Sequence, residues 1–222
     1  EVPSLLYNHF VNKIVLTFTF TVIAFISGWF SNQYFSNLKI KPNLPSLITL
    51  ERPFEKYAIE NLSKTDIVPG KLEIKEAISE DDTFTAYLFE FEFSPDLSGK
   101  LSKKITGQIN IPIGSGKFPL IVMFRGYIDQ KLYKTGDGTR KAAEVFAKNG
   151  FITIAPDFLG YGGSDKEAGN IFESRFQTYI TVLSLFKSLS TIELFNNETI
   201  FLWGHSNGGQ IALTVLEITG AK

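Results

Sequence analysis

Residues Thr199–Gly209 have the sequence Thr-Ile-Phe-Leu-Trp-Gly-His-Ser-Asn-Gly-Gly, and this stretch decides the fold. Its first five residues favour a short buried strand, and a helical pattern follows from about Asn207 to Thr219. Between them, Gly204-His-Ser-Asn-Gly208 matches the G-x-S-x-G elbow, a turn so sharp that the serine needs glycine on both sides. The stretch therefore predicts a strand, a tight turn that presents Ser206, and a helix.

Two upstream stretches fit the same pattern. Residues Phe118–Tyr127 are Phe-Pro-Leu-Ile-Val-Met-Phe-Arg-Gly-Tyr, and residues Ala155–Asp165 are Ala-Pro-Asp-Phe-Leu-Gly-Tyr-Gly-Gly-Ser-Asp. With the elbow, they resemble the α/β-hydrolase superfamily, especially its prolyl oligopeptidase-like and dienelactone hydrolase-like branch. The resemblance covers about Ile105–Lys222, so the chain would hold the N-terminal part of the catalytic domain.

The hydrophobic pattern predicts an α/β fold. Strands of period two between Lys71 and Pro112 favour antiparallel leading strands packed on one side only. From Phe118 on, continuous apolar strands alternate with helices, which favours a parallel sheet with flanking helices. Because the helix after Ser206 is apolar nearly all round, we expect the α/β-hydrolase fold to be truncated there, with further elements beyond Lys222.

Composition excludes several kinds of site and partner. The 222 residues carry a net charge of −1 and include no cysteine, so a disulfide, a thiolate nucleophile or a cysteine-based zinc site is impossible. The near-zero charge, without a long basic run, argues against nucleic acid as a partner. We expect no metal and no cofactor.

The N-terminal part predicts a membrane attachment. Residues 14–38 are uncharged and form a hydrophobic anchor or, alternatively, a signal peptide, although Leu16–Val22 also alternates like a strand. The organisation is then a flank at 1–13, the anchor at 14–38, a linker at 39–53 and an incomplete α/β-hydrolase domain at 54–222. We expect a single-pass protein with its catalytic domain outside the cytoplasm. A secreted protein is the alternative.

The elbow predicts acyl transfer through a serine. Such chemistry needs a nucleophile, a base, an acid that orients the base and donors for the oxyanion. Ser206 is the expected nucleophile, and the backbone N–H of Asn207 is one expected oxyanion donor. By resemblance, the backbone N–H of Tyr127 is the second donor and Asp157 is structural.

Arg125 stands where the family usually has histidine. The simpler interpretation is an arginine tied to a neighbouring carboxylate, and the alternative is a group that binds an anionic substrate.

The sequence does not supply a base. His205 is adjacent to Ser206 on the strained turn, His9 lies before the apolar segment, and the only acid after Ser206 is Glu217. We therefore predict that these 222 residues alone are poorly active, with the triad acid and histidine beyond Lys222. We expect a serine hydrolase that cleaves a small ester or a peptide, with esterase action favoured because a β-propeller is missing. The alternative is a non-catalytic binding module of the same fold.

Overall fold

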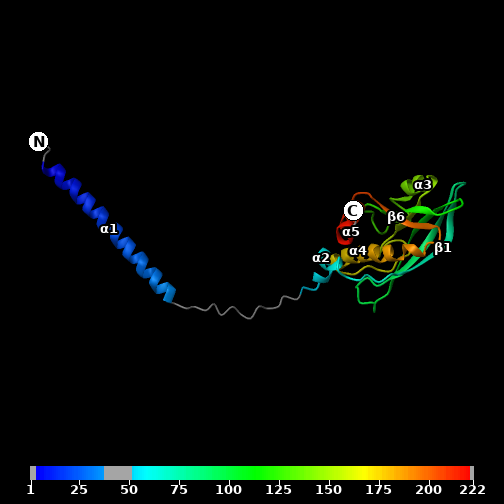
Figure 1. The fold of residues 1–222 in the computed structure, drawn as a ribbon, viewed down its shortest axis with the longest axis horizontal. Coiled ribbons are helices and arrows are strands. Elements are labelled where there is room, and N and C mark those ends of the chain that lie inside the picture. The colour runs from blue at the N-terminus through cyan, green and yellow to red at the C-terminus, as the bar shows by residue number, and fades with distance from the viewer. Residues whose placement is uncertain (1–3, 38–51, 221–222) are drawn as a thin grey trace. The chain divides into compact units, whose positions relative to one another are not determined.

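The computed structural model describes residues 4–37 and 52–220. Residues 39–51 of the predicted linker lie outside the described part. The chain divides into two compact units, Glu1–Glu51 and Arg52–Lys222, which we describe separately (Figure 1).

The first unit contains one long helix, α1 (Ser4–Asn37). The threonines that alternate with apolar residues do not form a strand. Their hydroxyls instead donate to carbonyls four residues back, as Thr17 Oγ1 does to Lys13 O at 2.8 Å. Asn12–Tyr34 has a mean hydropathy of 1.9, and none of its residues is buried. Length and composition therefore suit a membrane span, although a signal sequence meets the same criteria.

The second unit contains a six-stranded sheet with helices on both faces (Figure 1). Its strands are β1 (Lys71–Glu80), β2 (Phe84–Phe93), β3 (Lys103–Pro112), β4 (Phe118–Phe124), β5 (Ile152–Pro156) and β6 (Phe195–Gly204). Its α-helices are α2 (Ile59–Leu62), α3 (Arg140–Lys148), α4 (Ile171–Ser188) and α5 (Asn207–Thr219).

The strand order is β1-β2-β3-β5-β4-β6. Neighbours from β1 through β3 to β5 are antiparallel, whereas β4 is parallel to both β5 and β6. This topology confirms the predicted α/β class, with antiparallel leading strands followed by parallel ones.

Alternate residues of β4 belong to two separate cores. Leu120, Val122 and Phe124 pack into the larger core, which also contains residues of α4 and α5. Ile121 and Met123 pack into the smaller core on the opposite face, against α3. Since side chains alternate between the faces of a strand, α3 covers one face of the sheet and α4 and α5 cover the other.

One detail of the sheet differs from the prediction. Ile105 and Ile109 of β3 point into the larger core, but Thr106, Gln108 and Asn110 on its other face are buried as well. The expectation of packing on one side only is therefore wrong for β3. The reason is tertiary, because α3 contacts this strand and Gly163 N–H from a distant loop donates to Thr106 Oγ1 at 3.1 Å.

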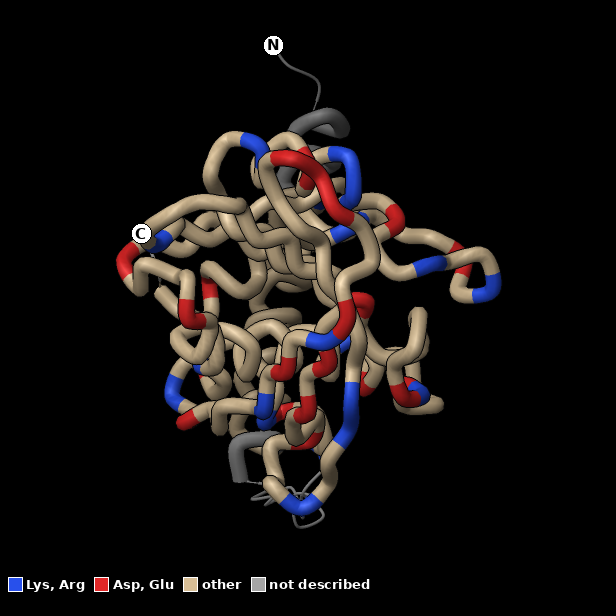
Figure 2. The backbone as a smooth tube through the Cα atoms, turned by 90° about the vertical axis from the view of Figure 1, so that its right-hand side faces the viewer, with Lys and Arg blue, Asp and Glu red and all other residues tan. Residues whose placement is uncertain are grey.

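The outer surface of the leading strands is a mixed-charge face. Glu90 accepts from Lys104 Nζ at 2.6 Å and lies 3.2 Å from Lys75 Nζ, and these lysines lower the pKa of Glu90. Figure 2 shows the two signs of charge interleaved over this unit. Glu90 is thus part of a solvated strand face.

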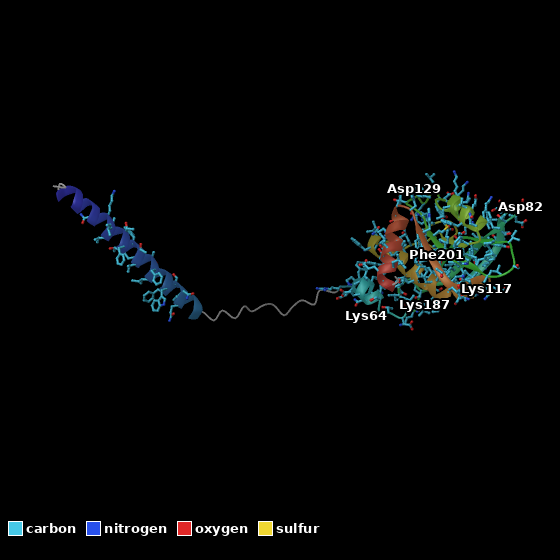
Figure 3. All side chains as sticks on the ribbon, turned by 45° about the horizontal axis from the view of Figure 1, so that its top comes forward. Lys64, Asp82, Lys117, Asp129, Lys187 and Phe201 are labelled. Carbon is cyan, nitrogen blue, oxygen red and sulfur yellow. The ribbon has the colours of Figure 1, made fainter. Side chains whose placement is uncertain are left out.

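Strand β6 is an edge of the described sheet, and its outer residues are only partly covered. Phe201 is 46% exposed, although its ring contacts Phe151 with centroids 5.9 Å apart (Figure 3). The following helix α5 buries Ile211, Val215 and Ile218 and exposes Leu213.

Helix α4 begins with a side-chain cap. Asn170 Oδ1 accepts from the backbone N–H groups of Phe172 at 2.9 Å and Glu173 at 3.2 Å. These bonds satisfy two of the donors that a helix start leaves unpaired. The cap fixes where α4 enters the fold, and α4 forms a wall of the site described below.

Replacing this cap tests its contribution to stability. We expect Asn170→Ala to lower the free energy of unfolding by about 1 kcal/mol, since two N–H groups lose their acceptor. Asn170→Asp keeps a cap acceptor and should stay close to the wild type. Urea denaturation of the three proteins measures the difference, and equal midpoints for Asn170→Ala and wild type would contradict the assignment.

Candidate active site

The backbone at Ser206 is strained. Ser206 has φ of 52° and ψ of −117°, and α5 begins at the next residue, Asn207. A non-glycine residue at positive φ costs on the order of 1–3 kcal/mol and persists only where the surroundings enforce it. The strain presents an exposed Ser206 side chain at the N-terminal end of α5, where the helix dipole is positive.

The flanking glycines are a steric requirement. A Cβ at Gly208 would lie 1.9 Å from Phe124 O, and a Cβ at Gly204 would lie 2.5 Å from Gly208 O. Both distances are far inside van der Waals contact. The predicted glycines therefore let the elbow close on itself and approach the end of β4.

The loop after β4 contacts the elbow directly. His205 N–H donates to Phe124 O at 3.1 Å. A Cβ at Gly126 would lie 3.4 Å from Ser206 Cβ. Tyr127, the next residue of the loop, is therefore brought close to Ser206 although 79 positions separate the two in sequence.

The residues that carry the two expected oxyanion donors line one pocket. Asn207 and Tyr127 both line a cavity of about 640 Å³ beside the elbow. Within residues 4–37 and 52–220, neither backbone N–H donates a hydrogen bond. Two unpaired donors near an exposed hydroxyl could bind the oxygen of a polarised carbonyl group.

His205 lies on another side of the elbow. Its side chain lines a separate cavity of about 470 Å³, together with Trp203 and residues 137–142. The chain's other histidine, His9, belongs to α1 in the first unit. The described residues therefore bring a hydroxyl and two N–H donors together without a histidine ring in the same pocket.

Asp157 is the centre of a buried hydrogen-bond network. It is 0% exposed, and its Oδ1 accepts from the Tyr133 hydroxyl at 2.6 Å. Its Oδ2 accepts from Thr106 Oγ1 at 2.6 Å and from Thr135 Oγ1 at 2.7 Å. Burial and the neighbouring carboxylate raise the pKa of Tyr133, so this hydroxyl keeps its proton. The network ties the loop after β4 to the loop after β5.

Arg125 is packed into the same region and is 5% exposed. Its Nη1 donates to Gly126 O at 3.0 Å and its Nη2 to Asp157 O at 3.2 Å. Its guanidinium carbon lies 3.8 Å from the ring centroid of Tyr161 and 4.6 Å from that of Tyr133. The neighbouring groups that hold Arg125 are thus carbonyls and aromatic rings, where the simpler interpretation had expected a carboxylate.

Sequence reasoning did not find two charged residues of the pocket, Glu167 and Arg175. No motif marks them, since each is a single charge in a loop or on an amphipathic helix. Their common location follows from the packing of α4 beside α5. Among the described residues, no group of three His, Asp or Glu side chains is arranged to hold a metal ion.

The steric role of the elbow glycines can be tested by a matched pair. Gly208→Ala should destabilise the fold by about 3 kcal/mol or more, because the new methyl group meets the backbone of β4. Gly209→Ala should be tolerated, since its Cβ would lie 3.8 Å from the nearest carbonyl and alanine favours a helix. Thermal unfolding of both variants compares them, and equal melting temperatures would show that the close approach to Phe124 is not required.

Comparison with known proteins agrees with this geometry. A sequence profile of the alpha/beta hydrolase fold matches residues 119–219. An uncharacterized 31.7 kDa protein in the traX-finO intergenic region of Escherichia coli is 33% identical over 115 residues, which are 50% of this chain and 36% of that protein.

Solved esterases share the architecture. Acetyl xylan esterase 1 from Thermoanaerobacterium sp. JW/SL YS485 superposes with a TM-score of 0.56 at 21% identity, over 76% of this chain and 55% of that chain. An acetyl xylan esterase from Paenibacillus sp. R4 superposes with a TM-score of 0.52 at 18% identity, over 72% of this chain and 53% of that chain. Methylesterase BT1017 superposes with a TM-score of 0.55 at 19% identity, over 74% of this chain and 36% of that chain.

The chain thus spans about half the length of the two acetyl xylan esterases and about a third of its curated relative. These likenesses do not distinguish the prolyl oligopeptidase-like and dienelactone hydrolase-like branch, which stays a prediction. The elbow, the strand order and the matched profile agree that the chain has an alpha/beta hydrolase fold.

Proposed function

We propose that the protein is a serine hydrolase that cleaves an ester through an acyl-enzyme on Ser206. The observation that carries this proposal is the strained, exposed Ser206 next to Asn207, which has an unpaired backbone N–H and lines the same pocket as Tyr127, whose backbone N–H is unpaired too. The esterase neighbours support ester over peptide cleavage. A non-catalytic binding module of the same fold is the alternative.

The reaction would proceed in two halves. Ser206 Oγ attacks the carbonyl carbon of the ester while its proton passes to a base. The N–H groups of Asn207 and Tyr127 bind the oxyanion, and each such donor typically contributes about 2.7–4 kcal/mol to the transition state. The alkoxide leaves with the proton from the base, and a water molecule then cleaves the acyl-enzyme in the same manner.

The base is not one of the groups described around Ser206. The His205 side chain lines the other cavity, and Asp157 is buried and already accepts three hydrogen bonds. We therefore propose that the histidine and its orienting acid lie beyond Lys222. It follows that the full-length protein should be active and that residues 1–222 alone should hydrolyse esters poorly.

A fluorophosphonate probe distinguishes a hydrolase from a binding module, because only an activated serine reacts with it. We expect the full-length protein to be labelled and Ser206→Ala to lose the label completely. Ser98→Ala, an exposed serine in the turn between β2 and β3, is the matched control and should keep it. If the full-length wild type were not labelled, the binding module would be the better interpretation.

We further propose that α1 anchors the protein in a membrane, with the Arg52–Lys222 unit outside the cytoplasm. The apolar segment Asn12–Tyr34 has 23 residues, which corresponds to about 35 Å of helix, enough to cross a hydrocarbon core of about 30 Å. A cleaved signal peptide and a secreted protein are the alternative.

Extraction from membranes tests the anchor. The full-length protein should stay in the membrane pellet at alkaline pH, because about 20 apolar residues remain inserted without any ionic contact. Deletion of residues 1–38 should move it to the soluble fraction. A mature N-terminus that lies within or after this segment would instead show that the segment is a signal peptide.

A further inference from the structure

The pocket beside the elbow contains an arginine side chain whose N–H donors are only partly used by other protein groups. The pocket lies between α4, α5 and the loops after β4 and β5, and most of its wall is apolar or aromatic. Phe158, Leu159, Ile171, Phe172 and Ile211 contribute to this wall. Charged side chains among such neighbours select ligands by charge, since water screens them less than it does on an open surface.

The two arginines of the pocket differ in what holds them. Two carbonyls and two tyrosine rings already surround the guanidinium of Arg125. The Arg125 side chain is 5% exposed and bridges the two loops, and among its nitrogens only the buried Nε has no hydrogen-bond partner. Another residue of the pocket is better suited than Arg125 to bind an anionic substrate.

Arg175 is that residue. Its Nε donates to the Tyr179 hydroxyl at 3.0 Å, and its Nη2 donates to Gln210 Oε1. Both partners are neutral, and no Asp or Glu within the described residues forms an ion pair with Arg175. A guanidinium has five N–H donors, so most of its capacity for an anion is unused.

Arg175 lies near the expected oxyanion donor Asn207. Gln210, which holds its guanidinium, follows the expected oxyanion donor Asn207 by three residues on α5, a rise of about 4.5 Å along the helix. Arg175 and Asn207 line the same cavity. The cavity therefore connects Arg175 with the residue that follows Ser206.

The one carboxylate of the pocket is held separately. Glu167 accepts from Gln130 Nε2 at 2.6 Å and from the Ser174 hydroxyl. These bonds keep it on the loop after β5, without a contact to Arg175. The pocket thus presents an acid and an unneutralised cation as two separate groups.

We propose that the pocket binds a carboxylate-bearing ester, with the carboxylate of the substrate on Arg175. The planar guanidinium can bind both carboxylate oxygens at once, while the apolar wall accommodates the carbon skeleton. Calling the bound molecule a substrate depends on the serine hydrolase proposed above. The anion site itself depends only on the geometry of Arg175.

The test uses the full-length protein and compares the release of acetate from 4-acetoxybenzoate with its release from the methyl ester of this compound, which lacks the negative charge. We expect the ratio of kcat/KM for the anionic over the neutral ester to fall about tenfold in Arg175→Gln, mainly through KM, since a charge-assisted hydrogen bond to a half-exposed group is lost. Arg175→Lys keeps the charge and should recover part of this ratio. Arg52→Gln, which removes an exposed arginine at the start of the second unit, should not change it.

Glu167→Gln should change the ratio of kcat/KM in the direction opposite to Arg175→Gln. It keeps the shape of the side chain and removes the negative charge, so the ratio should rise severalfold above wild type. Structural damage would not lower the ratio in Arg175→Gln and raise it in Glu167→Gln. A ratio unchanged by both variants, with the methyl ester still hydrolysed, would overturn the anion site and leave the hydrolase proposal intact.

A binding measurement can support the anion site even if the hydrolase proposal fails. The amide 4-acetamidobenzoate should bind wild type and bind Arg175→Gln about tenfold more weakly by calorimetry. If this difference were found without hydrolysis of either ester, the anion site would stand and the hydrolase proposal would fail. Equal affinity in both proteins would overturn the anion site.

Discussion

The candidate site depends on one close approach of two backbones. At Gly208 the elbow comes so near the end of β4 that a single methyl group would overlap Phe124 O. The same approach places His205 N–H on that carbonyl and sets Tyr127 beside Ser206. The strained φ of Ser206 follows from this packing, because a relaxed turn would move α5 away from the strand. The free energy stored in the turn is offset by the cores that hold α5 and β4 together.

A buried polar network makes this approach rigid. Loops of this length would ordinarily move, and an oxyanion donor must be held to within about 0.5 Å to be effective. Asp157 joins the loop after β4 to β3 and to the loop after β5 through three hydroxyl donors. Arg125 fills the space between two tyrosine rings and is bonded to carbonyls of both loops. Both charges are therefore used for positioning, at the high desolvation cost that a buried charge carries unless it is well bonded.

The sequence specified those features that local physics controls. Gly204 and Gly208 identify the elbow because only glycine fits there. The change of period near Phe118 predicted the change from antiparallel to parallel strands, although not the strand order. Features that arise from packing between distant segments could not be predicted in this way. The second buried face of β3, the aromatic surroundings of Arg125 and the position of Arg175 each require residues more than 30 positions apart to meet.

In the proposed hydrolase, the reacting groups and the residues that would select the substrate lie on different parts of the fold. The hydroxyl and the N–H donors belong to tight turns at the ends of β4 and β6, where a methyl group at Gly204 or Gly208 would meet backbone. Five of the fourteen residues that line the pocket belong to α4, and Ile171 and Phe172 at its start are more than half exposed. The start of the helix accepts changes of side chain at small cost to the core, because the buried residues of α4 all lie from Gln177 onward. Substitutions in α4 and at Glu167 can therefore change substrate selectivity while the turns that hold Ser206 stay the same. For this reason the charge of Arg175 bears on the choice of substrate, whereas the elbow bears only on the reaction.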